Sequence, residues 1–359
     1  MALEFEAAHA LEVRGSEKCL RVGREPRVRF GRGRAARRPG AEGRRVSHGL
    51  PRRVILVTRR TRLQDIVARH NTLAQARFTI EHLGADFGDY LREDEAYGAS
   101  LRQTVETLQA WGRWQMVDRT LLANFVFDAS DIVVALGQDG LVANTLKYLD
   151  GQPLVGLNPE PARWDGVLLP FTPPDLARLL PEVAAGRRAD RAVTMAQARL
   201  GDGQTLLAVN DLFIGPRTHT SALYDIAQGG VSEAQSSSGV IVSTGLGSTA
   251  WLRSVVTGSM AIARALGEGG RTAPEAAWHA LPWDAPQLVF AVREPFPSRG
   301  SRTALVYGHV SAEQPLTLRS RMSDQGVIFS DGMEADFLRF PAGMEAVVAP
   351  ARRRGRLVV

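Results

Sequence analysis

A glycine-spaced segment rich in hydroxyl side chains, Ser238–Trp251, is the part of this sequence best suited to hold a ligand. It begins as a short apolar strand, passes through a turn that contains Gly245 and Gly247, and continues as the start of a helix. Backbone N–H groups and the positive end of the helix dipole face outward at such a turn, which therefore favours a phosphate or a ribose. The alternative is an ordinary helix start with Ser248 or Thr249 as the N-cap.

A second turn, Gly137-Gln138-Asp139-Gly140, follows a buried-type strand and opens a helix. Its two glycines let the backbone approach a phosphate closely. Asp139 lies where a carboxylate could orient or deprotonate an attacking hydroxyl, or help to place a magnesium ion. The alternative is a strand-to-helix turn in which Asp139 only caps the helix.

Two adjacent polar residues, Asn210 and Asp211, interrupt the apolar strand pattern of residues 206–214. If they are buried, each unmet polar group costs about 1–3 kcal/mol, and a ligand amide or ribose would supply the missing partners. The alternative is an edge strand or a bulge with both side chains in water.

Strands and helices alternate in the first half of the chain, around the turn at Gly137. Such alternation indicates a parallel sheet wound with helices. Ligands of such sheets bind at the carboxyl ends of the strands, where the basic turn of Arg59, Arg60 and Arg62 would also lie. The predicted elements are strands over 53–58, 131–136 and 153–158 and helices over 63–83, 100–111 and 141–149.

After residue 185 the pattern changes to short strands separated by turn signals, which predicts an all-β domain. Gly201-Asp202-Gly203 and Asp331-Gly332 predict hairpins, and one helix is predicted over 249–266. The predicted domains are an arginine-rich tail (1–52), an α/β domain (53–185) and a β-rich domain (186–359) whose last strand is free to return to the first domain. Strands are predicted over 192–200, 206–214, 240–244, 287–293, 303–307, 316–320, 327–329 and 346–348.

Composition excludes several classes of protein. No apolar run reaches the roughly 18–20 residues that a membrane span needs, so no membrane partner is expected. The single cysteine, Cys19, lies in the tail, which excludes a disulfide framework, a cysteine zinc site and a cysteine nucleophile in the body. The tail is also where the basic charge lies: residues 1–53 carry a net +8 (14 Lys and Arg, 6 Asp and Glu) against +6 for the whole chain. The body is near neutral, so no nucleic-acid partner is expected.

The first 52 residues show no sustained hydrophobic period and are typical of a disordered arm. Their arginine content leaves a mitochondrial transit peptide as an alternative, but Glu4, Glu6, Glu12 and Glu17 fall where such peptides are poor in acid. We therefore expect a cytoplasmic protein, with the mitochondrial matrix as the alternative location.

Taken in this order, the motifs resemble those of the NAD kinase family over residues 53–350. Members carry Gly-Gly-Asp-Gly-Thr after a strand, Asn-Glu on a later strand, and a Thr-Gly-Ser segment that ends in Ala and an aromatic residue. Here these stretches are Gly137–Leu141, Asn210-Asp211 and Ser243–Trp251. Residues 210–215, 221–224, 237–239 and 293–295 are most similar to the mitochondrial-type NAD kinases.

The resemblance implies an α/β + all-β, two-domain fold: a wound parallel α/β domain followed by a β-sandwich-like domain. It implies transfer of the γ-phosphoryl group of ATP, with Mg²⁺, to the adenosine-ribose 2′-hydroxyl of NAD, by a homodimer or homotetramer. By motif match, Asp139 would activate or orient that hydroxyl. The other implied residues are Gly137 and Gly140 at the phosphates, Asn210, Asp211, Ser248, Thr249 and Ala250 at the NAD, and Trp251 at the aromatic position that ends the segment.

The chain departs from the family pattern at the turns that would bind nucleotide. Gln138 replaces a glycine, Leu141 replaces a threonine and Asp211 replaces a glutamate, while Ser238 stands where many bacterial members have an aspartate. Arg60 and its neighbours could supply positive charge for ATP, although a solvated basic loop is the alternative.

Two other functions stay open on the sequence. A non-catalytic sensor of NAD or NADP would fit the altered Gly137–Leu141 turn beside better-kept nucleoside motifs. A kinase for a lipid or sugar hydroxyl would share the Gly-Gly-Asp-Gly-type turn, but Ser243–Trp251 points away from it.

Overall fold

The computed structural model describes residues 51–266 and 280–359, which fall within one compact unit. Most of the predicted tail, and Cys19 with it, lies outside the described residues. Among those described, no helix combines the length and the apolar character that crossing a bilayer requires.

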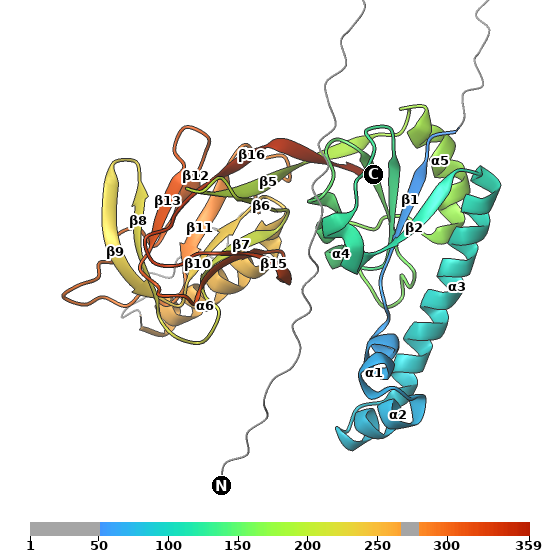
Figure 1. Ribbon diagram of the computed structural model, residues 1–359, viewed down its shortest axis with the longest axis horizontal. Coiled ribbons are helices and arrows are strands. Elements are labelled where there is room, and N and C mark those ends of the chain that lie inside the picture. Colours follow the sequence, from blue (N-terminus) through green and yellow to red (C-terminus); the bar gives the residue numbers. More distant parts are fainter. Residues whose placement is uncertain (1–50, 267–279) are drawn as a thin grey trace, which may run out of the picture. The chain divides into compact units, whose positions relative to one another are not determined.

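Parallel strands covered by helices on both faces form the first part of the fold, as the alternating pattern predicts (Figure 1). Alternate residues of each strand face opposite ways, so Ile55 and Val57 join one hydrophobic cluster while Val54 and Leu56 join another. The elements are β1 (Val54–Thr58), β2 (Trp114–Asp118), β3 (Ile132–Leu136) and β4 (Pro153–Leu157), in the order β2-β1-β3-β4, with α3 (Phe87–Trp111), α4 (Asp139–Leu146) and α5 (Leu176–Ala184).

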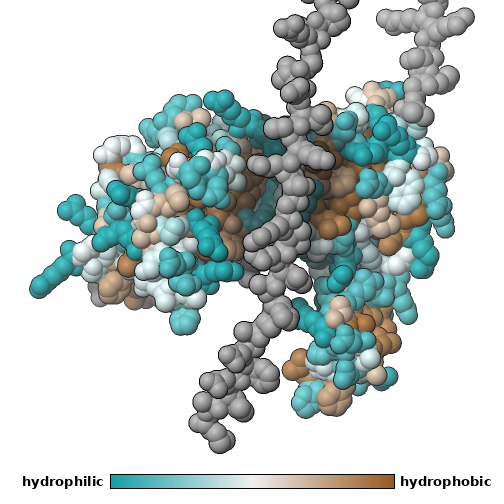
Figure 2. All heavy atoms as spheres, in the orientation of Figure 1, coloured by the Kyte–Doolittle hydropathy of each residue, from teal (hydrophilic) through white to brown (hydrophobic). Residues whose placement is uncertain are grey.

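The single helix predicted over 63–83 is wrong, because two helices occupy this segment: α1 (Arg62–His70) and α2 (Leu73–His82). Asn71 adopts a left-handed φ of 63°, which ends α1, and the Thr72 hydroxyl accepts the Gln75 N–H to begin α2. Large apolar side chains of α2 are exposed, and apolar surface is visible over this region in Figure 2.

An antiparallel sheet in the order β12-β11-β10-β7-β14-β15 forms one layer of the second part. The buried residues of one of its faces pack into a single large cluster with those of the other sheet. Helix α6 (Trp251–Leu266) packs Leu252 against β11. The strands are β7 (Asp211–Pro216), β10 (Val240–Ser243), β11 (Leu288–Val292), β12 (Tyr307–Val310), β14 (Gly326–Ser330) and β15 (Met333–Arg339).

The long last strand, β16 (Glu345–Val358), joins the parallel sheet to the second part. It pairs antiparallel with β5 (Asp190–Leu200) and β13 (Leu316–Ser320), and parallel with β4 through Arg356 and Pro153. The remaining strands of this sheet are β6 (Thr205–Ala208), β8 (Ala222–Gln228) and β9 (Val231–Ser237). A mixed sheet with a parallel α/β part, together with a separate antiparallel sheet, is the predicted fold class.

Several local predictions need correction. The strand predicted over 206–214 is two strands, β6 and β7, in different sheets, with Asn210 at the break. Strand β12 begins at Tyr307, where the predicted strand 303–307 ends. The sequence pattern did not predict β2, α5, β8, β9 and β15. Strand β9 shows the reason: its polar Glu233 and Gln235 are buried, and their hydrogen-bond partners come together only in the folded chain.

Candidate nucleotide site

The turn at Gly137 joins the carboxyl end of β3 to the start of α4. The Gly137 N–H donates to Leu157 O at 3.1 Å, and a Cβ at Gly137 would lie 2.8 Å from Leu141 Cδ2. Gln138 is the N-cap but its side chain makes no capping hydrogen bond, while Gly140 is exposed with open space beside it. The first turn of α4 therefore offers N–H groups that no cap side chain occupies, the arrangement that favours an anion.

Asp139 is fixed by the backbone of a distant loop. Its Oδ1 accepts the Leu168 N–H at 2.7 Å, and none of the described residues donates a hydrogen bond to Oδ2. The carboxylate is partly exposed. It is thus held in one orientation with an acceptor left for a ligand hydroxyl, as a general base requires.

Asn210 and Asp211 are held by the carboxylate of Asp331 on the β14–β15 hairpin. Asp331 Oδ1 accepts the N–H groups of Val209, Asn210 and Asp211 at 3.1, 2.7 and 3.3 Å. In return the Asp331 N–H donates to Asp211 O at 3.0 Å. The sequence predicts a hairpin at Asp331-Gly332, and nothing local shows where the Asp331 carboxylate points.

Asp211 is buried with one carboxylate oxygen, Oδ1, that has no hydrogen-bond partner among the described residues. The pKa of Asp211 is raised to about 7: burial is the main cause, a hydrogen bond from Ser243 lowers the pKa, and the nearby Asp331 charge adds to the rise. An unmet acceptor at this place fits a ligand hydroxyl or amide.

Lys147, which belongs to none of the sequence motifs, links α4 to the same hairpin. Its Nζ donates to Ser330 Oγ at 2.9 Å and pairs with Asp336 Oδ2 at 2.6 Å, and Tyr148 OH also donates to that oxygen. Lys147 is 3% exposed. The helix that begins at Asp139 is therefore tied at its far end to the hairpin that holds Asn210 and Asp211.

The Ser243–Trp251 segment lies against the break at Asn210, and its buried hydroxyls make hydrogen bonds within the fold. Thr244 donates its backbone N–H to Asn210 O at 2.9 Å, and a Cβ at Gly247 would lie only 2.1 Å from the same oxygen. The buried Ser248 hydroxyl donates to Gly245 O at 2.7 Å and accepts the Leu281 N–H at 3.1 Å. The ligand role of Ser248 stays a prediction, and its hydroxyl already has two partners.

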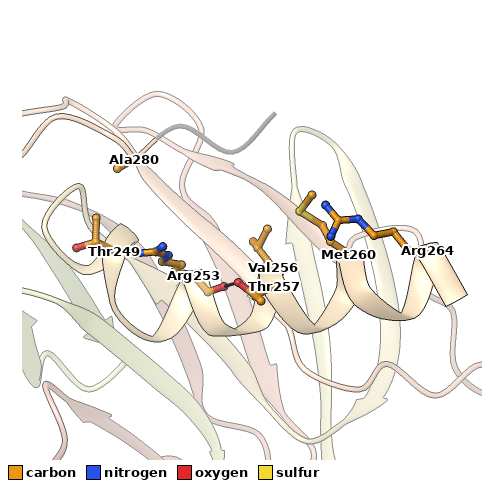
Figure 3. Close-up of a pocket in the computed structure, with 7 residues that line it drawn as sticks. All are labelled: Thr249, Arg253, Val256, Thr257, Met260, Arg264 and Ala280. Atoms are coloured by element: carbon orange, nitrogen blue, oxygen red, sulfur yellow. Dashed lines mark hydrogen bonds between the residues drawn. The ribbon is translucent and has the colours of Figure 1, made fainter. Parts of the chain in front are cut away.

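Thr249 and Ala250 are exposed at the start of α6. Thr249 lines a pocket of about 410 Å³, and Figure 3 shows its neighbours along the same helix. The pocket residues are Thr249, Arg253, Val256, Thr257, Met260, Arg264 and Ala280.

Trp251 is half-buried in an aromatic cluster. Its ring stacks on Phe213 with centroids 5.6 Å apart, and Phe213 in turn stacks on Phe329 at 4.9 Å. The Arg293 guanidinium lies 5.4 Å from the Trp251 ring. These side chains line a second pocket of about 240 Å³, so Trp251 both packs the fold and borders a cavity.

The predicted phosphate contact, Arg60, is exposed after β1, whereas Arg59 is the arginine beside the Gly137 turn. Arg59 pairs with buried Glu93 at 3.1 Å and donates through Nη1 to Arg60 O at 3.0 Å. Its Nε has no hydrogen-bond partner among the described residues and lies 3.6 Å from the place of a Cβ at Gly137. The fold thus uses Arg59 to hold the backbone that presents Arg60.

The structure brings the predicted residues together in two groups. One contains Gly137, Asp139 and Gly140 at the start of α4, and the other contains Asn210, Asp211 and the Ser243–Trp251 segment. Leu141, Val209 and Leu246 belong to the same hydrophobic cluster, which connects the groups.

Comparisons with known proteins agree with the predicted resemblance. No protein-family model matches the chain. An NAD kinase from Methylococcus capsulatus is 32% identical over 130 residues, which make up 34% of this chain and 44% of that relative. The match thus spans less than half the length of the relative.

The chain also matches two solved structures. Yeast NADH kinase complexed with NADH matches with a TM-score of 0.53 and 13% identity, over 86% of this chain and 84% of that one. An NAD kinase from Archaeoglobus fulgidus in complex with ATP has a TM-score of 0.49 and 15% identity, over 86% and 93%. The resemblance to NAD kinases is therefore confirmed in sequence over one segment and in fold through the yeast enzyme.

Proposed function

We propose that this protein is an NAD kinase, which transfers the γ-phosphoryl group of ATP to the adenosine-ribose 2′-hydroxyl of NAD. The observation that carries the proposal is Asp139, a carboxylate fixed by the Leu168 N–H at the open start of α4, with one oxygen left for a hydroxyl. The NAD kinase likeness in sequence and fold supports it.

In this proposal Asp139 orients the 2′-hydroxyl and accepts its proton as the oxygen attacks the γ-phosphorus, while the bond from that phosphorus to the β,γ-bridging oxygen breaks and ADP leaves. The phosphates lie against the first turn of α4, where exposed Gly140 leaves the backbone accessible beside the buried Gly137. The helix dipole and the uncapped N–H groups stabilise the negative charge there.

The NAD would be held by the second group of residues. Asp211 Oδ1, which lacks a partner, accepts a ribose hydroxyl or an amide N–H, and Asn210 beside it supplies both a donor and an acceptor. Thr249 and Ala250 present exposed backbone and a hydroxyl nearby, and Trp251 offers a ring face.

ATP brings magnesium with it in this proposal. The described residues contain no cluster of three or more His, Cys, Asp or Glu suited to a metal ion. The phosphate oxygens would therefore supply most of the Mg²⁺ ligands, with Asp139 close to the reacting group. Exposed Arg60 would add a positive charge that the phosphates can reach.

A coupled assay tests the proposal: purified full-length protein is given NAD, ATP and Mg²⁺, and NADP is detected with an NADP-specific dehydrogenase. Asp139→Asn should lower the rate about 100-fold or more. Asp150→Asn is the matched control, because it changes an exposed Asp of another Asp-Gly pair. The proposal would be contradicted if the wild type forms no NADP, or if Asp139→Asn forms NADP as fast as Asp150→Asn does.

A dinucleotide sensor without kinase activity is favoured by one observation. The buried Leu141 side chain fills the space against Gly137, where the family has a threonine hydroxyl. Calorimetry that shows NAD binding with no turnover would support the sensor, and Gln138→Gly with Leu141→Thr should then create activity. Absence of any dinucleotide binding would exclude it.

We also propose a homodimer or homotetramer in the cytoplasm. Light scattering on the purified chain and fractionation of cells that express it would test the two statements separately.

A further inference from the structure

A large cavity lies on one face of the mixed sheet, and none of the predicted site residues lines it. It has a volume of about 750 Å³ and is floored by β5, β6 and β16. Alternation sets this face: Ala198 and Leu206 point into the core, while Gln197, Arg199 and Leu207 line the cavity. Pockets of about 300–1,000 Å³ are the usual size for small-molecule sites.

The cavity is cationic. Arg199, Arg352 and Arg353 line it, and no Asp or Glu does. Arg199 and Arg352 are both exposed. Within the described part of the chain, their side chains make no hydrogen bond and no ion pair. Arginines without acidic partners around a hollow attract a polyanion and bind phosphate oxygens two at a time.

A β-bulge places two of these arginines together. Pairing between β16 and β5 shifts from Pro350 opposite Ala196 to Arg354 opposite Thr194, so residues 351–353 lie outside the regular ladder. In a regular strand, neighbours point to opposite faces, yet Arg352 and Arg353 line the same cavity. Bulges re-aim side chains in this way, and they are frequent beside binding sites.

The rest of the lining is largely apolar. Leu207 comes from β6, Val347 and Ala349 come from β16, and Ala312 and Pro315 come from the turn before β13. An apolar floor beside a cationic rim fits a ligand that joins a ring to phosphates better than it fits a bare phosphate.

The cavity is also connected to the candidate catalytic helix. Arg353 Nη2 donates to the carbonyl of Lys147 at 2.8 Å, at the carboxyl end of α4. The Lys147 ammonium in turn binds Ser330 and Asp336 on the hairpin that holds Asn210. A ligand that engages Arg353 would act on the helix that carries Asp139.

We propose that this cavity is a second ligand site, which binds a nucleoside polyphosphate and is separate from the proposed catalytic site. The phosphates contact Arg199, Arg352 and Arg353, and the nucleoside lies on the apolar floor. The site does not require the kinase activity proposed above.

Calorimetry on the full-length chain tests the site, with ADP and inorganic tripolyphosphate as probes. ADP should show two binding events in the wild type. Arg199→Gln with Arg352→Gln should weaken one of them at least tenfold and leave the melting temperature unchanged, because neither side chain has a partner among the described residues. Tripolyphosphate, which lacks a ring, should bind this site more weakly than ADP does.

The matched control is Arg319→Gln with Arg339→Gln, which removes the same charge from exposed strand positions outside the cavity. The control should bind ADP as the wild type does. Unchanged ADP binding in the cavity variant, or equal weakening in the control, would overturn the proposal. If the wild type makes no NADP and the cavity variant still loses one ADP binding event, the kinase proposal is contradicted and the proposal of this second site is supported.

Discussion

Asp211→Asn should remove a large part of the pH dependence of this protein's stability. Asp211 is 7% exposed and sits near Asp331, and its burial raises the pKa from 3.8 to about 7. The folded state therefore binds a proton more tightly than the unfolded state does. A raised carboxyl pKa gives stability that is complete below about pH 4 and is lost as pH rises to about 7.

The magnitude follows from the size of the shift. One pKa unit corresponds to about 1.4 kcal/mol, so a shift of about three units corresponds to about 4 kcal/mol over the whole range. About two of these three pH units lie between pH 5 and pH 8. Over that range Asp211 therefore lowers the free energy of unfolding of the wild type by about 2.5 kcal/mol. Asparagine has the same shape and cannot ionise, so the variant escapes this loss.

Urea unfolding of the wild type and Asp211→Asn at pH 5 and pH 8 measures the effect. The variant should gain about 2.5 kcal/mol relative to the wild type between the two pH values, and the comparison cancels every group that both proteins share. Asp324→Asn, which changes an exposed carboxylate, is the control and should gain almost nothing.

Parallel pH dependences of the wild type and Asp211→Asn would refute the reasoning. That result would mean that Asp211 is already ionised in the folded protein, with a partner for Oδ1 that the fold or a bound ligand supplies. The assignment of Asp211 as an unmet acceptor would then be lost.

Other substitutions test the framework around the site by urea unfolding. Asp331→Ala should cost about 3 kcal/mol, since three backbone N–H groups lose their acceptor, while Asp331→Asn, which keeps one acceptor oxygen and suits the left-handed φ of 53°, should cost less; equal costs would contradict the role. Lys147→Met should cost about 3 kcal/mol by leaving a carboxylate unpaired, and adding Asp336→Leu should recover most of it; no recovery would show that packing, not charge, matters. Gly245→Ala should lower the free energy of unfolding by at least about 3 kcal/mol, because its Cβ would lie 1.9 Å from the Pro282 carbonyl oxygen. Gly140→Ala should keep stability, since the space beside Gly140 is open, and should lower kinase activity. A Gly245→Ala variant as stable as the wild type would refute the packing argument.

Local sequence patterns predicted the elements whose signals lie in adjacent residues. The apolar runs of β1, β3 and β4, the hairpin at Gly201–Gly203 and the strand Leu316–Ser320 were all found where expected. A local signal was misread at Asn71 and Thr72, where a left-handed residue followed by an N-cap divides one apparent helix into two.

The site shows the same division. The sequence by itself determined that a glycine turn with Asp139 follows β3, and that Asn210-Asp211 and a Ser/Gly segment come later, because each motif is a short run with its own chemistry. Only the tertiary structure decided which distant side chains hold these motifs in place. The Asp331 carboxylate reaches Asn210 over 121 residues, and Lys147 reaches Asp336 over 189. Side-chain pairs so far apart leave no local periodicity, so their geometry exists only once the sheets have packed.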